Sequence, residues 1–266
     1  MKDILKRLAR GELSVDEAER LLKGLSIAEV ADLAKLDVNR EIRKGFPEIV
    51  LAEGKRPKDI AKIASNMVEK NGRAIVSRLD ADHVKVLQSM KNEDIVVEVY
   101  ERARIAILRR ADHRVERNPG KVGVLTAGTS DIPVAEEARI IAEEMGCTVF
   151  SSYDTGVSGI HRLFPPLTEM INNDVDIIVV IAGREGALPT VVSGLVDIPI
   201  IAVPTSIGYG YGGKGVSALM SMLQACSLGI AVVNIDGGVA AGSMAALIAR
   251  RAHRGEDPPS KTVHHL

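Results

Sequence analysis

From residue 121 onward, short apolar segments with the character of β-strands alternate with segments that have a helical period. The strand-like segments are nearly continuous apolar runs, which is typical of parallel strands covered by helices on both faces. The sequence therefore predicts an α/β fold with three layers around a mostly parallel sheet. The expected strands are 121–128, 148–154, 176–183, 199–206 and 229–236, and the expected helices are 132–146, 159–173, 188–196, 216–227 and 240–253.

A smaller N-terminal α/β domain with a helical start is expected before this region. Ser14 and Glu17 are spaced as a capping box ahead of a periodic apolar face, which predicts a helix. Strand-like segments follow at 74–80 and 95–110, with a helical segment between them. The polar segment "RVERNPGK" marks a boundary, so we expect domains at 1–117 and 118–266.

Composition excludes several classes of function. The chain has no Trp, three Phe and four Tyr, so few aromatic side chains are available for stacking with the bases of a single-stranded nucleic acid. We therefore expect no nucleic-acid partner. Its two cysteines cannot form a disulfide framework, and no Cys/His cluster suggests zinc. No uninterrupted apolar stretch is long enough to span a membrane and no signal peptide opens the chain, so a cytoplasmic location without membrane contact is expected.

The strand-to-helix loops are where the chemistry is expected, because ligands bind at the carboxyl ends of strands in such sheets. In the first loop, "TAGTSDIP", Gly128 permits close approach of a ligand to the backbone. Thr129 or Ser130 can cap the helix that follows, and a helix N-terminus after a strand favours an anion. Asp131 adds a carboxylate beside this anion pocket. Ordinary helix capping explains the same residues equally well.

The next two loops carry charged residues. His161 and Arg162 open a helix, where Arg162 could pair with a phosphate, although a lone histidine is more often structural. In the loop "IAGREGALP", Gly183 precedes Arg184 and Glu185 directly after the most apolar strand. Burial of an opposite-charge pair at a strand end is costly unless the pair is used. This loop is therefore interpreted as functional.

Two further loops complete the set. "PTSIGYGYGGKG" resembles a phosphate-binding P-loop from Gly208 onward, but Gly215 stands where Ser or Thr should hold magnesium. An NTPase is therefore not expected, while a nucleotide contact at Gly208 remains open. Asp236 ends the last strand-like segment, where it could bind a ligand or act as a cap.

Cys226 stands between an apolar helical segment and an apolar strand-like segment. Free cysteines are commonly buried and inert, so packing is the first interpretation of this residue. A nucleophile aimed at a substrate is the alternative. The residue types around it do not decide between the two.

The chain resembles the LarB family, the carboxylase/hydrolase of nickel-pincer cofactor biosynthesis. The segments that carry the resemblance are "GTSDIPVAEEA", "AGREGALPTVVSGLVDIPIIAVPTS" and "MLQACSLGIAVVNIDGG", together with the upstream "LDVNREIRKGFPE". Residues 120–250 also resemble, more distantly, PurE, the aminoimidazole ribonucleotide carboxylase/mutase. The resemblance implies a PurE/flavodoxin-like sheet and a homo-oligomer, expected to be an octamer.

The LarB resemblance implies a two-part reaction on nicotinic acid adenine dinucleotide. The pyridinium ring is carboxylated at C5 with CO2 or bicarbonate as co-substrate, and the phosphoanhydride is hydrolysed to release AMP. The product is pyridinium-3,5-biscarboxylic acid mononucleotide. A thiolate that adds at C4 makes C5 a nucleophile toward CO2, so Cys226 is expected to be the catalytic nucleophile.

The same resemblance suggests roles for the other residues. Asp131 or Glu185 is expected to transfer protons, and the Gly128–Asp131 turn to bind a phosphate or carboxylate. Mg²⁺ is the expected cofactor of anhydride hydrolysis, with ligands that the sequence does not identify. In the basic N-terminal half, the cations expected near the dinucleotide phosphates are Arg40, Arg43 and Lys44. Asp37 is a possible ligand of a metal ion or a water molecule.

Two other functions compete with this one. A PurE-like mutase acting on an imidazole ribonucleotide would need neither a cysteine nucleophile nor an N-terminal domain. A non-catalytic nucleotide-binding protein would use the same anion loops, and replacement of Cys226 by alanine would leave it unharmed.

Overall fold

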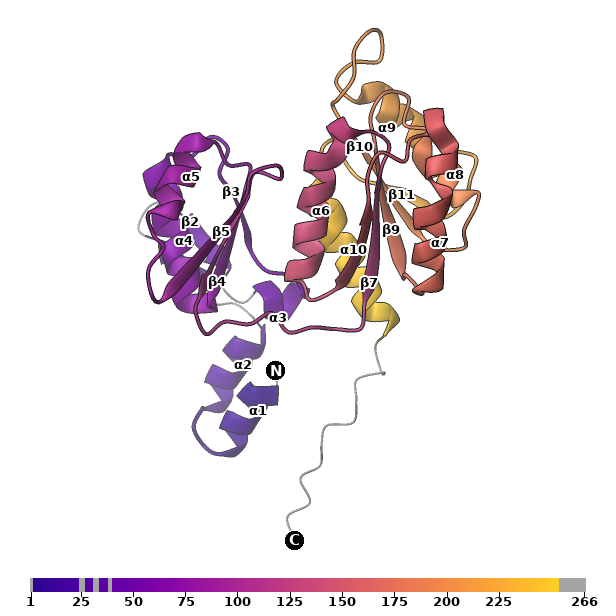
Figure 1. Ribbon diagram of the computed structural model, residues 1–266. Helices are drawn as coiled ribbons and strands as arrows, with labels where there is room; N and C mark the ends of the chain where they lie inside the picture. The colour runs from indigo at the N-terminus through magenta and orange to yellow at the C-terminus, as the bar shows by residue number, and fades with distance from the viewer. Residues whose placement is uncertain (1, 24–26, 31–33, 38–39, 254–266) are drawn as a thin grey trace. The chain divides into compact units, whose positions relative to one another are not determined.

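The computed structural model describes residues 2–23, 27–30, 34–37 and 40–253 (Figure 1). The chain forms two compact units, Met1–Arg114 and Val115–Leu266. The expected boundary at residue 118 falls three residues after this division. Each unit has its own sheet and its own core, so the two are described separately.

The N-terminal unit begins with two helices and a hairpin. Helix α1 spans Lys2–Ala9 and α2 spans Val15–Lys23. The capping box predicted at the start of α2 is present: the Glu17 N–H donates to Ser14 Oγ at 3.2 Å, and the Ser14 N–H donates to Glu17 Oε2 at 2.9 Å. The antiparallel strands and short helix that follow are β1 (Ile27–Val30), β2 (Ala34–Asp37) and α3 (Arg40–Lys44).

The main sheet of this unit is mixed, with strand order β3-β4-β6-β5. Strands β3 and β4 are parallel, and the other pairs are antiparallel. Helices α4 and α5 contact each other and pack on the sheet over a core that includes Ile60, Met67 and Leu108. The elements are β3 (Ile49–Leu51), α4 (Pro57–Asn71), β4 (Arg73–Ser77), α5 (Ala81–Gln88), β5 (Ile95–Tyr100) and β6 (Ile105–Arg110).

The C-terminal unit has a five-stranded, all-parallel sheet with strand order β11-β10-β9-β7-β8. The predicted three-layer α/β fold is therefore confirmed. The strands are β7 (Lys121–Thr126), β8 (Thr148–Ser152), β9 (Ile177–Ala182), β10 (Ile200–Pro204) and β11 (Ile230–Val232). All six residues of the central strand β9 are buried, which explains why its sequence is an unbroken apolar run.

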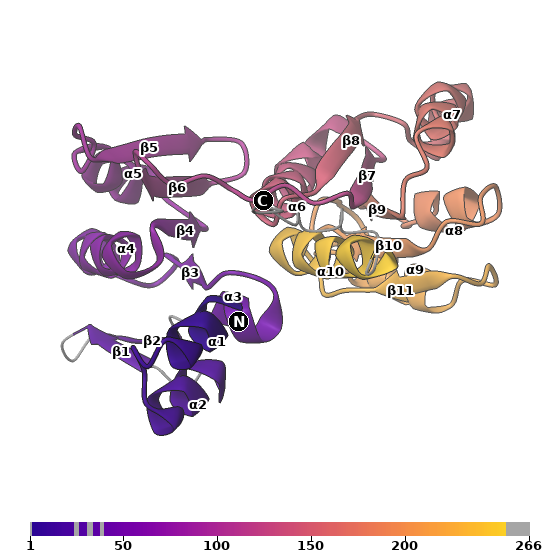
Figure 2. The same ribbon diagram turned by 90° about the horizontal axis from the view of Figure 1, so that it is seen from below.

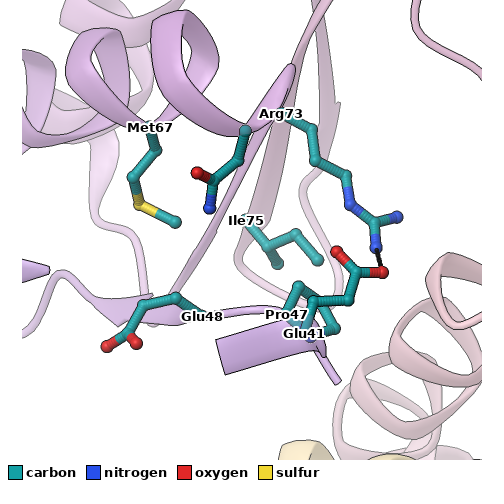
Figure 3. A pocket seen from close by; sticks show the side chains of 7 residues that line it. Glu41, Pro47, Glu48, Met67, Arg73 and Ile75 are labelled. Carbon is teal, nitrogen blue, oxygen red and sulfur yellow. Dashed lines mark hydrogen bonds and ion pairs between the residues drawn. The ribbon is translucent and has the colours of Figure 1, made fainter. Parts of the chain in front are cut away.

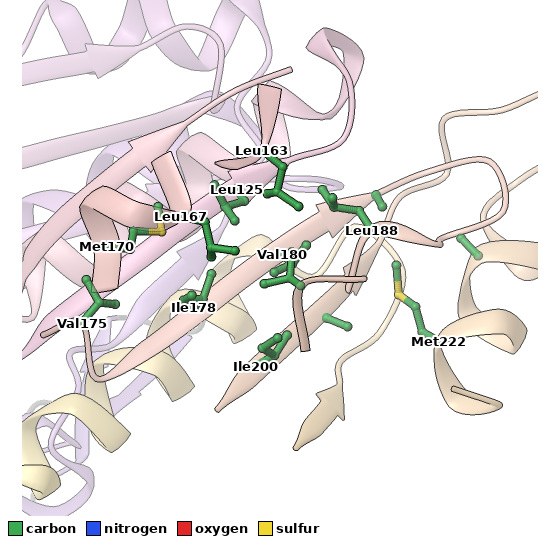
Figure 4. Close-up of a cluster of buried hydrophobic side chains, with 14 residues drawn as sticks. Leu125, Leu163, Leu167, Met170, Val175, Ile178, Val180, Leu188, Ile200 and Met222 are labelled. Carbon is green, nitrogen blue, oxygen red and sulfur yellow. The ribbon is translucent and has the colours of Figure 1, made fainter. Parts of the chain in front are cut away.

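Helices cover both faces of this sheet (Figures 1 and 2). Helices α6 (Ile132–Glu144) and α10 (Gly238–Ala252) pack together on one face. The other face is covered by α7 (Phe164–Asn172), α8 (Leu188–Ser193) and α9 (Val216–Leu223). Figure 4 shows the core between the sheet and this second group, where Leu125, Val180 and Leu188 are buried.

Two segments differ from their predicted helices. The segment 159–173 begins as the 3₁₀ turn η2 (Val157–Arg162), and α7 starts only at Phe164, with prolines in its first turn where a missing N–H is tolerated. The segment 216–227 is helical only as far as Leu223. Cys226 therefore lies beyond the end of α9 and not within it. Among the described helices, none combines the length and apolar character that a membrane crossing requires.

The contact between α6 and α10 depends on small residues. A Cβ atom on Gly242 would stand far inside van der Waals distance of the Ala138 carbonyl oxygen, and one on Gly238 would meet the Val134 carbonyl in the same way. Buried alanines such as Ala245 continue this surface of α10. The two helix backbones therefore approach more closely than most side chains allow.

Gly242→Ala tests this close contact. Helix propensity alone predicts that alanine stabilises α10 by about 1 kcal/mol. The clash with backbone atoms predicts the opposite, and we expect the free energy of unfolding to fall by about 1–3 kcal/mol. Urea unfolding monitored by circular dichroism measures the change, with Gly213→Ala as control, since a Cβ there meets nothing closer than 3.5 Å. A stabilised Gly242→Ala variant would contradict the packing described.

Candidate functional site

The carboxyl ends of β7 and β9 form the point at which the strand order of the sheet reverses. The chain leaves β7 toward β8 on one side and leaves β9 toward β10 on the other. In open parallel sheets, ligands bind in the crevice that such a reversal creates. The loops at these ends, with the neighbouring loops after β8, β10 and β11, are called the carboxyl-edge loops.

Asp131 is the most enclosed acid of these loops, with 4% of its surface exposed. Its Oδ1 accepts a hydrogen bond from Thr205 Oγ at 2.7 Å, and its Oδ2 accepts one from the Gly128 N–H at 2.9 Å. The side chain thus joins the loops after β7 and β10. Thr205, which is fully buried, was not singled out from sequence, although it directly follows an apolar strand.

Burial raises the pKa of Asp131 above its usual range, because the charged form loses solvation. The nearby charge of Asp236 acts in the same direction. Hydrogen bonds from Thr205, Gly128 and Gly183 oppose the rise, because they favour the ionised form. A carboxylate with a raised pKa in a ligand-binding crevice has the properties of a general base.

Gly183 allows the loops after β9 and β10 to meet. A Cβ atom there would lie 2.5 Å from the Ile207 carbonyl oxygen and 2.7 Å from Thr205 Oγ. It would also stand 3.4 Å from Asp131 Oδ1. Glycine is therefore required at this position for packing around Asp131. The presence of Gly183 in the "AGREG" segment is thus explained without a ligand.

Four non-glycine residues of the carboxyl-edge loops have left-handed backbone conformations: Asp154 (φ 59°), Arg184 (φ 51°), Lys214 (φ 62°) and Asp236 (φ 54°). They follow β8, β9, β10 and β11. Such conformations are unfavourable for residues with a side chain and gather at functional sites. Asp236 is also held by its side chain, since its Oδ1 accepts the Ser206 N–H at 2.8 Å.

The predicted burial of Arg184 and Glu185 was wrong, because both side chains are exposed. Burial at this point ends with Ala182, and the left-handed turn at Arg184 carries both residues out to solvent. The Arg184 guanidinium lies over the Tyr209 ring, 4.6 Å from its centroid. Arg184 therefore offers an accessible cation at the carboxyl edge, and Glu185 an accessible carboxylate.

His161 and Arg162 lie in η2, after β8, and both are exposed. Arg162 forms a close ion pair with Asp154. The guanidinium is thus held near the end of β8 by one carboxylate. An anionic ligand would reach Arg162 from its solvent side.

The predicted capping by Thr129 or Ser130 is not the arrangement found. These exposed residues form a 3₁₀ turn, η1 (Thr129–Asp131), and α6 has Asp131 at its N-cap without a side-chain capping bond. The Asp131 carboxylate instead accepts a hydrogen bond from the Gly128 N–H. Gly208 lies beside the Arg184 backbone: a Cβ atom built on Gly208 would be 3.8 Å from the Arg184 backbone nitrogen.

Cys226 is exposed and is not part of the carboxyl-edge loops. It precedes β11, whose first residue, Ile230, is paired with Ile200 at the start of β10. The cysteine therefore lies toward the amino ends of the strands. Burial in the core, the first interpretation of this residue, is excluded by its exposure. The other cysteine, Cys147, is buried, and desolvation raises its pKa to about 11.

Arg40, a candidate residue of the N-terminal unit, is held by an ion pair. Arg40 contacts Glu48 at 3.2 Å and lies over the Phe46 ring at 5.0 Å. Figure 3 shows the neighbouring small pocket, where Arg73 reaches Glu41 at 2.7 Å.

Lys44, also in α3, is exposed. Asp37 ends β2 and Arg43 lies in α3, but the side chains of both are outside the described part of the structure.

A dedicated metal cage is not found among the described residues, since no three His, Cys, Asp or Glu side chains gather in a way that could hold an ion. Asp131 has both carboxylate oxygens in hydrogen bonds. The described residues therefore do not fit a resident Mg²⁺ ion. Mg²⁺ in enzymes is often bound by substrate phosphates together with only one or two protein carboxylates. A diphosphate substrate would therefore have to supply most of the ligands here.

Comparisons with known proteins cover both units. A family model described as the LarB/PurE-like N-terminal domain matches residues 28–110, and the AIR carboxylase model matches residues 121–257. The uncharacterized protein MJ0165 of Methanocaldococcus jannaschii is 44% identical over 259 residues, which are 96% of this chain and 98% of that protein.

Other relatives match a shorter part of this chain. An N5-carboxyaminoimidazole ribonucleotide mutase of Thermotoga maritima is 32% identical over 133 residues, 48% of this chain and 74% of that protein. One of Pyrococcus abyssi is 34% identical over 122 residues, 44% of this chain and 66% of that protein.

The parallel sheet, the enclosed acid at its carboxyl edge and these matches define a carboxylase-type enzyme of the AIR carboxylase superfamily. The chain belongs to the LarB family, with a PurE-like core in its C-terminal half.

Proposed function

We propose that this enzyme carboxylates nicotinic acid adenine dinucleotide at C5 of the pyridinium ring and hydrolyses its phosphoanhydride. The products are pyridinium-3,5-biscarboxylic acid mononucleotide and AMP, and the pathway served is nickel-pincer cofactor biosynthesis. The observation that carries the proposal is the union of a LarB/PurE-like N-terminal domain with an AIR carboxylase core that presents an exposed thiol, Cys226.

The proposed chemistry needs a nucleophile that can also leave. The Cys226 thiolate adds to C4 of the cationic ring, and the electron pair moves to nitrogen, which leaves a neutral dihydropyridine. C5 is then an enamine carbon and attacks CO2, forming a C–C bond. A base removes the C5 proton, and the ring nitrogen expels the thiolate from C4. The balance is one CO2 consumed and one proton released, without oxidation or reduction.

Asp131 is the proposed base for the C5 proton. Its burial and raised pKa suit a group that must accept a proton near neutral pH. Glu185, the other candidate, is exposed and has no comparable environment. We therefore favour Asp131 for this step and keep Glu185 as a residue of the loop that meets the ligand.

The anionic parts of the substrate need cationic and N–H partners. We propose that Arg184, His161 and Arg162, all exposed at the carboxyl edge, receive a phosphate or carboxylate together with the Gly128–Asp131 turn. Gly208 and Asp236 border the same loops. Arg40, Arg43, Lys44 and Asp37 of the N-terminal unit remain proposed partners of the dinucleotide.

Hydrolysis of the phosphoanhydride requires a water molecule and neutralisation of the leaving phosphate. We propose Mg²⁺ as the companion of the substrate diphosphate. The protein's own part in this step is to hold the diphosphate with the cations named above.

A homo-oligomer, expected to be an octamer, is part of the proposal. Large exposed apolar side chains on α9 and α10, such as Met220 (63% exposed) and Met244 (50% exposed), are available for subunit contacts. Native mass spectrometry of the purified chain should show octamers near micromolar concentration. A monomer as the sole species would contradict this part.

The alternative function is a PurE-like mutase, which is the activity named for the Thermotoga and Pyrococcus relatives. These relatives match less than half of this chain, whereas the LarB/PurE-like N-terminal domain matches residues 28–110 in addition to the AIR carboxylase core. The non-catalytic alternative predicts binding of adenine dinucleotides without turnover.

A substrate panel separates the three functions. The purified protein is incubated with Mg²⁺ and bicarbonate and with nicotinic acid adenine dinucleotide, NAD or N5-carboxyaminoimidazole ribonucleotide, and the products are separated by chromatography. Release of AMP from the nicotinic acid dinucleotide supports the proposal. Conversion of the imidazole ribonucleotide alone would establish the mutase, and binding without any product would establish the non-catalytic function.

A further inference from the structure

Two of the chain's four tyrosines, Tyr209 and Tyr211, lie in the loop that follows β10. Tyr209 is 81% exposed and Tyr211 is fully exposed. Aromatic side chains are scarce in this protein, which has no Trp and only three Phe. An exposed tyrosine at a ligand-binding edge offers a flat surface with an electron-rich face. Neither ring has a role in the reaction proposed above.

Tyr209 already holds a planar cation. The Arg184 guanidinium lies over the Tyr209 ring, 4.6 Å from its centroid. The face of an aromatic ring carries partial negative charge and attracts cations of this kind. Both side chains are exposed, so water is available to solvate the guanidinium, and it nevertheless lies on the ring. The contact identifies the face of Tyr209 as a place where a flat cation is bound.

Tyr209 lies close to the enclosed acid of the carboxyl edge. The Arg184 N–H donates to the Ile207 carbonyl oxygen at 3.3 Å. A Cβ on Gly183 would lie 2.5 Å from the same oxygen and 3.4 Å from Asp131 Oδ1. Tyr209 follows Ile207 by two residues, a span of at most about 7 Å. A ligand ring on Tyr209 is therefore near Asp131, the base proposed for its C5 proton.

The surroundings of Tyr209 leave room for a ligand. A Cβ on Gly210 would meet no atom of the described residues within 4 Å apart from its chain neighbours, and one on Gly208 would meet none closer than 3.8 Å. The loop is nevertheless anchored where it leaves β10, since the Ser206 N–H donates to Asp236 Oδ1 at 2.8 Å. Tyr209 is thus presented by an anchored loop with open space beside it.

We propose that Tyr209 is the platform for the pyridinium ring of the substrate, and that Arg184 leaves this platform on binding to pair with the carboxylate at C3 of that ring. This inference rests on the proposed function, because it is that reaction which brings a cationic ring to the carboxyl edge. One flat cation replaces another, so the face of Tyr209 holds a cation in both states. The displaced guanidinium gains a charge-assisted hydrogen bond to a carboxylate.

This exchange selects the substrate by two features. Tyr209 favours a ring with a permanent positive charge, which a pyridinium has and a neutral imidazole lacks. Arg184 favours the carboxylate of nicotinic acid adenine dinucleotide over the amide of NAD, because the amide carries no charge. The two residues together therefore determine which dinucleotide the site accepts.

Binding of NAD and of its reduced form tests the platform, because the two share the amide and differ in the charge of the ring. Both are titrated by calorimetry into a chain that carries Cys226→Ala, which prevents addition of the thiol to the ring. A further Tyr209→Leu replacement should lower the preference for NAD over its reduced form by about 5–30-fold, the range that a cation–π contact contributes. Tyr209→Phe keeps an aromatic face and should keep most of the preference.

Tyr211→Leu is the matched control, because it removes an exposed tyrosine from the same loop. It should leave the preference for the cationic ring unchanged. Replacement of exposed side chains normally has little effect on folding, and urea unfolding of each variant checks this. An unchanged preference in Tyr209→Leu would refute the platform. An equal loss in Tyr211→Leu, or failure of the Cys226→Ala chain to bind either form, would refute it too.

Arg184→Gln tests the exchange of partners, again in the chain with Cys226→Ala. Binding of nicotinic acid adenine dinucleotide should weaken by about tenfold or more, because its carboxylate loses a hydrogen bond from a charged donor. Binding of NAD should not weaken, since its amide is not paired with Arg184 and the guanidinium no longer competes for Tyr209. Equal weakening of both dinucleotides would show that Arg184 binds a phosphate common to both, which would overturn the exchange.

Binding and turnover together separate the possible failures. A wild-type protein without turnover of the dinucleotide, whose preference for the cationic ring is lost in Tyr209→Leu, would refute the proposed reaction and leave the platform standing. An active wild type whose preference survives Tyr209→Leu would refute the platform and leave the reaction standing.

Discussion

Cys226→Ala is expected to abolish carboxylation of the dinucleotide, with turnover reduced by at least about 10³-fold. Without the thiolate, C5 of the pyridinium ring remains electron-poor and does not attack CO2. Cys226→Ser should fail similarly, because a serine alkoxide is harder to form and a poorer leaving group. Turnover is measured as labelled carboxylate in the mononucleotide product.

The exposure of Cys226 makes this result interpretable. Replacement of an exposed side chain normally changes the free energy of unfolding by no more than about 0.5 kcal/mol, so lost turnover would not reflect lost folding. Cys147→Ala is the matched control and should retain activity, although removal of this buried side chain should lower stability. Undiminished turnover in Cys226→Ala would refute the nucleophile.

Asp131→Asn is expected to slow turnover by about 10²–10⁴-fold, the range by which general bases contribute to catalysis. Asparagine has nearly the same shape and can still accept one of the hydrogen bonds now made by Gly128 and Thr205. Binding of the dinucleotide, measured by calorimetry, should therefore change much less than turnover. Glu185→Gln is the comparison variant, and a larger loss there than in Asp131→Asn would assign the base to Glu185.

The raised pKa of Asp131 gives this prediction a pH signature. A base acts only when ionised, so turnover should fall as the pH drops through the pKa of Asp131, which lies above that of an ordinary aspartate. Thr205→Val removes a hydrogen bond that favours the ionised form. The acid limb of the pH profile should therefore move to higher pH. An unmoved limb would show that another group controls it.

The fold was largely predictable because its signals are local. The apolar run of β9 is unbroken since all six of its residues are buried, and alternation with helical segments defines a parallel sheet without any long-range information. The capping box at Ser14 was equally readable, because its partner lies three residues away. Helix ends were less predictable: α9 stops at Leu223 although apolar residues continue beyond it.

The candidate site was predictable only in part. Thr205 and Asp131 are 74 positions apart in sequence, so the bond between them is a consequence of strand order rather than of any motif. The exposure of Arg184 depends on a left-handed turn that the sequence "GREG" does not specify. Cys226 follows a helix whose direction relative to the sheet places it away from the other candidates, and that separation is visible only in three dimensions.

The most direct test of the proposed reaction is the mass spectrum of its product. Wild-type protein and Cys226→Ala are incubated with nicotinic acid adenine dinucleotide, Mg²⁺ and ¹³C-bicarbonate. Wild type alone is expected to yield AMP and a mononucleotide that carries one ¹³C-labelled carboxylate on its pyridinium ring. An unlabelled mononucleotide, intact dinucleotide from wild type, or equal labelling by both proteins would contradict the proposed reaction.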